Sequence, residues 1–184
     1  AFIGDSTFLH TGLPGLMNAA WNGADIVVCL LDNSTTAMTG GQPHPGMGLR
    51  LNGAPAKKIS LPDIAAAAGA DSVRRVNAFD LDSCKRAATE AAAEKGVRVI
   101  IFEGACINIV PKGKPLSVSE DSCTGCNVCV SKLGCPALSM GKLATIDPVL
   151  CTGCGLCAKV CPFDAIGNAA GGVTSVAKGG AKNE

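Results

Sequence analysis

Eight cysteines near the C-terminal end of the chain follow a repeated spacing that is suited to iron–sulfur chemistry. Each half of the pattern has three cysteines separated by two residues and a fourth that directly precedes proline: Cys123, Cys126, Cys129 and Cys135, then Cys151, Cys154, Cys157 and Cys161. Gaps of two residues let successive thiolates reach three corners of one cubane, whereas the fourth cysteine lies too far along the chain to complete it. The spacing therefore predicts two 4Fe–4S clusters.

The fourth cysteine of each half is expected to complete the cluster of the other half, because two-cluster cysteine runs of this kind exchange their fourth ligands. The first cluster is then bound by Cys123, Cys126, Cys129 and Cys161. The second cluster is bound by Cys135, Cys151, Cys154 and Cys157. The gap that precedes Cys135 is two residues longer than its counterpart and is expected only to lengthen a loop. Two structural zinc sites would also use pairs of cysteines, but they do not account for two triplets followed by Cys-Pro.

A second group of polar residues lies near the N-terminus, where two predicted strands end. Gly4-Asp5-Ser6 closes the first apolar segment, and Asp32-Asn33 follows the second. Ligands of parallel sheets bind beyond the carboxyl ends of the strands, and these two ends are expected to be neighbours. A carboxylate, an amide oxygen and a backbone carbonyl are ligands suited to Mg²⁺, which usually also takes phosphate oxygens. The alternative is a structural aspartate at a strand end and an asparagine in a turn.

Strand-like and helix-like segments alternate over residues 1–110, and this predicts an α/β domain with a parallel sheet flanked by helices. Strands are expected at 1–4, 25–31, 72–77 and 97–102, and helices at 13–22, 61–68 and 82–95. Asp82 is expected to cap the last helix and Gly96 to end it.

The remainder of the chain divides by composition. Residues 111–116 are a predicted linker, and residues 117–166 are a predicted small α+β domain that carries both clusters. Residues 167–184 are rich in Gly, Ala and Lys and are expected to be a flexible tail.

Composition also restricts the partners and the surroundings of the protein. The net charge of +1 gives no reason to expect binding to nucleic acid or to an anionic membrane. No apolar run is long enough to span a membrane, and the first residues lack the basic start of a signal peptide. Together with cysteines at metal-ligand spacing, these features predict a cytoplasmic protein in a reducing compartment.

The polar strand ends and their surroundings resemble a known enzyme family. Gly4-Asp5-Ser6, with Asn33 lying 28 positions after Asp5, is similar to the signature that binds thiamine diphosphate through Mg²⁺. Ser6 and Asp32 depart from it, since they replace a glycine and an asparagine. Segments 4–12 and 31–46 and the double cysteine pattern closely resemble the alpha subunit of the indolepyruvate ferredoxin oxidoreductases, which belong to the 2-oxoacid:ferredoxin oxidoreductase family. The resemblance covers about residues 1–166, in the same domain order.

The resemblance implies a set of binding and catalytic residues. Asp5, Asn33 and the backbone carbonyl of Thr35 would bind Mg²⁺. The strand ends and the loop at 39–42 would bind thiamine diphosphate through Gly4, Asp5, Ser6, Asn33, Thr35, Gly40, Gly41 and Gln42. His10 and His44 are candidates for proton transfer, each against the alternative of an ordinary loop histidine. Cys106 follows a predicted strand and could approach this site, whereas Cys29 and Cys84 are expected to be structural.

The family's reaction is the oxidative decarboxylation of arylpyruvates such as indolepyruvate, with coenzyme A, to an acyl-CoA and carbon dioxide. The resemblance implies that electrons pass through the two clusters to an external ferredoxin, in an anaerobic setting. It also implies a beta subunit and a missing N-terminal part of the same subunit, without which this fragment is expected to be inactive. Two alternatives stay open: pyruvate or another 2-oxoacid as substrate, and a non-catalytic electron-transfer subunit whose α/β domain binds no cofactor.

Overall fold

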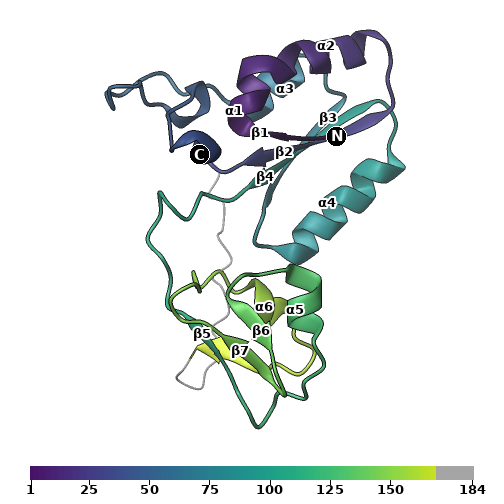
Figure 1. The fold of residues 1–184 in the computed structure, drawn as a ribbon. Helices are drawn as coiled ribbons and strands as arrows, with labels where there is room; N and C mark the ends of the chain where they lie inside the picture. Colours follow the sequence, from purple (N-terminus) through teal and green to yellow (C-terminus); the bar gives the residue numbers. More distant parts are fainter. Residues whose placement is uncertain (169–184) are drawn as a thin grey trace, which may run out of the picture. The chain divides into compact units, whose positions relative to one another are not determined.

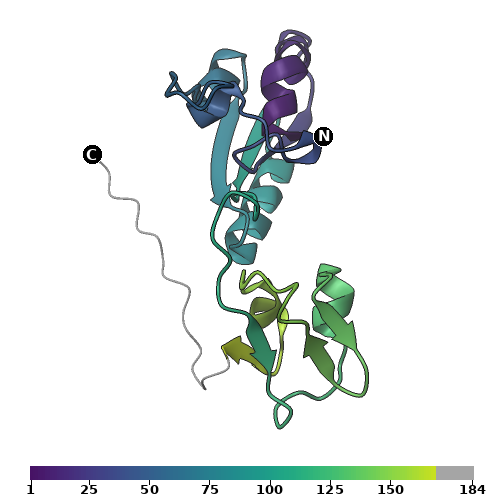
Figure 2. The same cartoon turned by 60° about the vertical axis from the view of Figure 1, so that its left-hand side comes forward.

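The computed structural model describes residues 1–168 and divides the chain into two compact units, with the division after Pro111. Figures 1 and 2 show the two units from two directions. The first unit contains one sheet with helices on both faces, and the second contains two short antiparallel sheets and two short helices. Within residues 1–168, no helix combines the length and the apolar character that a membrane crossing requires.

The first unit is built on a parallel four-stranded sheet with the strand order β1-β2-β4-β3. Its strands are β1 (Phe2–Gly4), β2 (Ile26–Asp32), β3 (Ser72–Asn77) and β4 (Val97–Glu103). Its helices are α1 (Asp5–Thr7), η1 (Phe8–Gly12), α2 (Leu13–Trp21), α3 (Leu61–Ala67) and α4 (Leu81–Ala93), with two short 3-10 helices, η2 (Ala37–Thr39) and η3 (Pro45–Met47). The prediction of a parallel sheet flanked by helices is therefore confirmed.

The central strand β4 is buried on both faces, as expected for a parallel sheet between two helical layers. Val99 and Ile101 lie on the face covered by the run α1-η1-α2 and by α3. Ile100, on the opposite face, packs against Ala87 and Ala91 of α4. Figure 1 shows α4 alone on its side of the sheet. Alternate residues of one strand thus supply both halves of the core.

The boundaries of α4 differ from the prediction at both ends. Asp80, not Asp82, is the N-cap residue, and its Oδ1 accepts a hydrogen bond of 3.3 Å from the Ser83 N–H. The prediction for Asp82 is wrong because the helix begins at Leu81, which places Asp82 in the first turn. At the other end the helix stops at Ala93, and Gly96 lies in the connection to β4 with φ of +88°.

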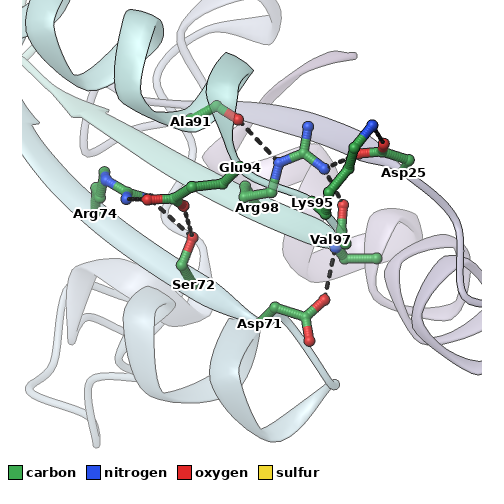
Figure 3. A network of polar contacts seen from close by, with 10 residues as sticks. Asp25, Asp71, Ser72, Arg74, Ala91, Glu94, Lys95, Val97 and Arg98 are labelled. Carbon is green, nitrogen blue, oxygen red and sulfur yellow. Dashed lines mark hydrogen bonds and ion pairs between the residues drawn. The ribbon is translucent and has the colours of Figure 1, made fainter.

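A polar network joins the C-terminal end of α4 to the amino ends of the strands (Figure 3). Arg98 is 5% exposed and donates from Nε to the carbonyl of Ala91 over 3.0 Å. Its Nη1 donates to the carboxylate of Asp25 and to the carbonyl of Gly96. Hydrogen bonds from Lys95 and Arg98 lower the pKa of Asp25. The buried guanidinium is therefore paired and hydrogen-bonded, which its burial requires.

The second unit is a small α+β arrangement. Strands β5 (Leu116–Val118) and β8 (Ile166–Asn168) form one antiparallel pair, and β6 (Leu138–Met140) and β7 (Ala144–Ile146) form the other. Helices α5 (Val128–Leu133) and α6 (Leu156–Val160) each carry the third cysteine of a triplet. The predicted flexible tail is wrong at its start, because Gly167 and Asn168 pair with Ser117 and Leu116. The rest of that predicted tail, 169–184, lies outside the described residues.

Gly96 provides a test of the backbone constraint at the start of β4. A Cβ at this position would lie 2.2 Å from Oδ2 of Asp71, which accepts the Val97 N–H over 2.7 Å. We expect Gly96→Ala to lower the free energy of unfolding by about 3 kcal/mol, because left-handed backbone strain and loss of the Asp71 hydrogen bond add together. Denaturant unfolding followed by circular dichroism measures this loss.

Gly53→Ala is the matched control for this variant. Gly53 has a φ of +79°, but a Cβ there meets nothing within 4 Å. Gly53→Ala should therefore lower the free energy of unfolding by only about 1–2 kcal/mol, the cost of left-handed backbone for a residue other than glycine. Equal losses in the two variants would contradict the role assigned to Asp71.

Candidate functional site

The carboxyl ends of β1 and β2 lie side by side, since Gly4 pairs with Leu31 in the parallel register. Asp5 follows β1 as the first residue of α1 and is only 2% exposed. Its Oδ1 accepts the N–H of Ser6 over 2.8 Å, and its Oδ2 accepts the N–H of Ser34 over 2.9 Å. A single carboxylate thus joins the first turn after β1 to the turn after β2.

The turn after β2 points its backbone donor at two carboxylates. Ser34 has a φ of +60°, in the left-handed region that few residues other than glycine adopt. Its N–H reaches Oδ1 of Asp32 over 3.0 Å as well as Asp5. Burial raises the pKa of Asp5; the Ser6 N–H and His44 oppose this shift, and the neighbouring Asp32 adds to it. A buried carboxylate with a second one beside it favours a bound cation.

His44 lies directly against this carboxylate. The ring is buried, and its Nε2 is 3.2 Å from Oδ2 of Asp5. The contact has the distance of an ion pair but not the angle of a hydrogen bond, so Nε2 has no hydrogen-bond partner among the described residues. The other ring nitrogen, Nδ1, accepts the Gly46 N–H over 3.2 Å.

Thr35 and Asn33 supply further oxygen atoms at the end of β2. Thr35 is 2% exposed, and its Oγ1 has no hydrogen-bond partner among residues 1–168. Asn33 closes a turn, since its Oδ1 accepts the Thr35 N–H over 3.1 Å. Its carbonyl accepts the N–H of Cys106 over 2.9 Å, so the backbone of Cys106 does reach the site. A buried hydroxyl without a partner, on the residue that follows the Ser34 donor to Asp5, fits a metal and a phosphate group.

The loop after Thr35 is closed on itself and tied to α1. The Thr36 N–H donates to the carbonyl of Gln42, and the Gly41 N–H donates to the carbonyl of Thr36, both over 3.1 Å. The Thr36 hydroxyl donates to Oγ of Ser6 over 2.8 Å. Gly40 and Gly41 have φ values of +113° and +79° and, like Gln42, are exposed. These predicted loop residues are thus connected to the strand ends through Ser6.

The two candidate histidines have different surroundings. His10 is exposed on η1, and its side chain makes no hydrogen bond or ion pair with any described residue. His44 is the one buried against Asp5. The available signal was its position between Pro43 and Pro45, which stiffens the segment. Sequence alone did not show that this segment folds back onto the end of β1.

Cys29 and Cys84 are half-buried thiols away from these contacts. Burial raises the pKa of both, which makes them less reactive than exposed thiols. The Cys84 thiol donates to the carbonyl of Asn77 over 3.3 Å.

In the second unit, cysteines from both halves of the repeat surround one cavity. Its lining contains four cysteines, namely Cys123, Cys126, Cys129 and Cys161. Burial raises the pKa of Cys129, and the neighbouring Cys161 and Cys126 add to this shift. Four thiols around a single cavity fit a polynuclear iron–sulfur group. No three Cys, His, Asp or Glu side chains among residues 1–168 converge as single-ion ligands do.

The remaining triplet is also clustered. Burial, followed by the charges of Cys154 and Cys151, raises the pKa of Cys157 to about 11. Cys135 packs against the apolar cluster that contains Cys157. A thiol with such a pKa is protonated at neutral pH, so a metal must displace its proton to bind.

Left-handed glycines shape both Cys-Thr-Gly-Cys turns. Gly125 and Gly153 have φ values of +71° and +72°. A Cβ on Gly125 would lie 2.7 Å from the carbonyl oxygen of Lys142, and one on Gly153 would lie 2.6 Å from that of Lys114. Because the obstacles are backbone atoms, only glycine fits at either position.

Comparison with known proteins agrees with both units. Residues 1–102 match the family described as thiamine pyrophosphate enzyme, C-terminal TPP binding domain, and residues 144–167 match the 4Fe-4S binding domain. The chain is 43% identical over 176 residues to the indolepyruvate oxidoreductase subunit IorA of Pyrococcus abyssi and to that of Thermococcus kodakarensis. Identity to the IorA subunit of Archaeoglobus fulgidus is 42% over 174 residues. These matches cover 90% of this chain but only 27–28% of each relative.

The unpartnered hydroxyl of Thr35 gives a test of the site's geometry. We expect Thr35→Val to leave the free energy of unfolding of the metal-free protein unchanged or to raise it by about 1 kcal/mol, because it removes an unsatisfied buried polar group. The adjacent variant Thr36→Val should lower it by about 1 kcal/mol, since it breaks the bond to Ser6. Denaturant unfolding of the two variants measures these free energies. If Thr35→Val and Thr36→Val destabilised the protein equally, the Thr35 hydroxyl would have a partner.

Proposed function

The chain belongs to the thiamine pyrophosphate enzyme family, and on this premise we propose that it is the cofactor-binding and electron-transfer part of an indolepyruvate:ferredoxin type of oxidoreductase. The reaction is the oxidation of an arylpyruvate with coenzyme A to an acyl-CoA and carbon dioxide, with two electrons passed to ferredoxin. The observation that best supports this proposal is that one chain contains both a buried carboxylate at the strand ends and four thiols around one cavity. The names of the relatives support the oxidoreductase class.

The strand ends provide the metal and diphosphate ligands in this proposal. Asp5, Asn33 and the carbonyl of Thr35 bind Mg²⁺, with the charge of Asp5 balancing the metal. Thiamine diphosphate, when bound, supplies the electron sink for decarboxylation of the 2-oxoacid. Gly4 leaves room beside β1, since a Cβ there would meet nothing within 4 Å. Ser6 holds the loop of Gly40, Gly41 and Gln42 against the site through Thr36.

The cysteines of the second unit bind two 4Fe–4S clusters in this proposal. Cys161 completes the cluster of Cys123, Cys126 and Cys129, and its place in the lining of their cavity supports this. Cys135 completes the cluster of Cys151, Cys154 and Cys157. The protein then works in the reducing cytoplasm, where the cysteines stay available as ligands.

The proposed assembly includes chains other than this one. The relatives carry the name of a subunit, and this chain spans about a quarter of their length. We therefore include as partners a second subunit, the rest of the same subunit and an external ferredoxin. The arylpyruvate and coenzyme A sites then include residues from those parts.

Asp5→Ala tests the proposed metal–diphosphate site in the intact enzyme. The change removes a metal ligand together with its charge, so thiamine diphosphate retention and indolepyruvate-dependent ferredoxin reduction should both be lost. Cofactor content after gel filtration and the rate of ferredoxin reduction measure the two effects. Asp63→Asn, an exposed first-turn residue of α3, should behave as the wild type.

Iron content shows whether the Asp5→Ala protein is folded. The clusters lie in a separate compact unit, so iron and visible absorbance should persist in the variant. A variant that still binds the cofactor and reduces ferredoxin would refute the site.

The cluster assignment predicts iron content and ligand exchange. Anaerobically purified enzyme should hold about eight irons in the unit that contains the two cysteine triplets, from two four-cysteine cubane sites. Cys161→Ala should disturb the same electron paramagnetic resonance signal as Cys123→Ala and a different one from Cys157→Ala. Cys84→Ala should leave both signals intact. Zinc in place of iron would end the assignment, and a Cys161→Ala spectrum matching Cys157→Ala would show that the fourth ligands are not exchanged.

A further inference from the structure

We propose that His44 is a positioning residue that orients the carboxylate of Asp5 for the metal through the Nε2 edge of its ring. The inference rests on the proposed function, because it assigns a role toward the Mg²⁺ of that site. It adds a residue to the set that the sequence indicated around Asp5, Asn33 and Thr35.

Burial and proximity are the first argument. The side chains of His44 and Asp5 are 3% and 4% exposed, and Nε2 lies 3.2 Å from Oδ2. A buried imidazole N–H without a good acceptor is costly, and among residues 1–168 this carboxylate is the acidic group at ion-pair distance from Nε2. The Nε2 edge of the ring therefore faces the carboxylate that is to bind the metal.

The tautomer follows from the other side of the ring. The Gly46 N–H donates to Nδ1 over 3.2 Å, so Nδ1 must present a lone pair. In a neutral imidazole the proton then lies on Nε2, which faces Asp5. Nε2 is therefore the ring nitrogen that can donate toward Oδ2 of Asp5, 3.2 Å away.

The surrounding segment fixes the place of the ring. His44 is extended, with φ of −135° and ψ of 166°, and its carbonyl accepts the Met47 N–H over 2.9 Å. The carbonyl of Pro45 accepts the Ile59 N–H over 2.9 Å, which ties the segment to the chain before α3. A Cβ on Gly46 would lie 3.0 Å from Cε1 of His44 and 3.2 Å from its Nδ1. A side chain at residue 46 would therefore press on the ring and shift it from this position.

Two backbone donors and one ring contact then act on the two oxygens of Asp5. The Ser6 N–H holds Oδ1, and the Ser34 N–H and the His44 ring face Oδ2. Mg²⁺ demands near-ideal oxygen geometry, so a carboxylate that cannot rotate is a better ligand than a free one. Groups that orient a metal ligand typically contribute about tenfold to 100-fold in metal affinity.

Two amide variants separate positioning from mere filling of space. The side-chain nitrogen of His44→Gln can occupy the place of Nε2, whereas that of His44→Asn reaches only the place of Nδ1. In the intact enzyme, Mg²⁺ is titrated by calorimetry at saturating thiamine diphosphate. We expect His44→Asn to weaken Mg²⁺ binding about tenfold or more, and His44→Gln to retain most of the affinity.

A steric variant and a kinetic readout complete the test. Gly46→Ala keeps the imidazole but displaces it, so it should weaken Mg²⁺ binding as His44→Asn does. Saturating Mg²⁺ should restore kcat in His44→Asn, because the reacting groups are intact. A structural defect would not be repaired in this way.

The possible outcomes test the positioning role of His44 separately from the proposed function. Equal Mg²⁺ affinities in His44→Gln and His44→Asn, whether both normal or both weakened, overturn the positioning role and leave the proposed function standing. A wild-type enzyme that binds no Mg²⁺ with thiamine diphosphate overturns the proposed function itself.

Discussion

The buried carboxylate of Asp5 is the constraint on which the site of the first unit depends. Little water reaches its charge, so donors or a bound cation must compensate it. The backbone meets this demand with two N–H groups, one of which requires the left-handed conformation of Ser34. His44 adds a third contact from a distant segment. The remaining demand is for positive charge, which a divalent metal would supply.

The groups that stabilise the fold and the groups that could bind a ligand lie at opposite ends of the parallel strands. At the amino ends of the strands, the buried Arg98 donates to Ala91, Gly96 and Asp25 (Figure 3). At the carboxyl ends, Thr35 and His44 each retain a buried polar atom without a hydrogen bond in the part of the chain described. Complete networks stabilise a fold, whereas incomplete ones mark places where a ligand completes them. This contrast within one domain favours the carboxyl ends of the strands as the place where a ligand binds.

Apolar runs and helix spacing made the sheet and its helices predictable, because burial on both faces of β4 leaves a continuous hydrophobic signal. Helix caps were less predictable, since Asp80 and Asp82 are chemically equal candidates and only packing chooses between them. The contact of His44 with Asp5 spans 39 positions and depends on how an irregular loop returns to the sheet. No periodic pattern encodes such a return, so the sequence did not distinguish His44 from His10. The pairing of Gly167 and Asn168 was hidden by a glycine-rich composition that resembles a tail.

The two departures from the thiamine diphosphate signature have physical explanations in the structure. Ser6, in place of glycine, turns its hydroxyl toward the Thr36 hydroxyl, so the extra side chain anchors the loop through a 2.8 Å hydrogen bond. Asp32, in place of asparagine, accepts the Ser34 N–H over 3.0 Å, a role that either residue could perform. Only the aspartate adds negative charge, however, and it contributes to the raised pKa of Asp5. The substitution thus makes the metal-free site less favourable for two ionised carboxylates and strengthens its preference for a bound cation.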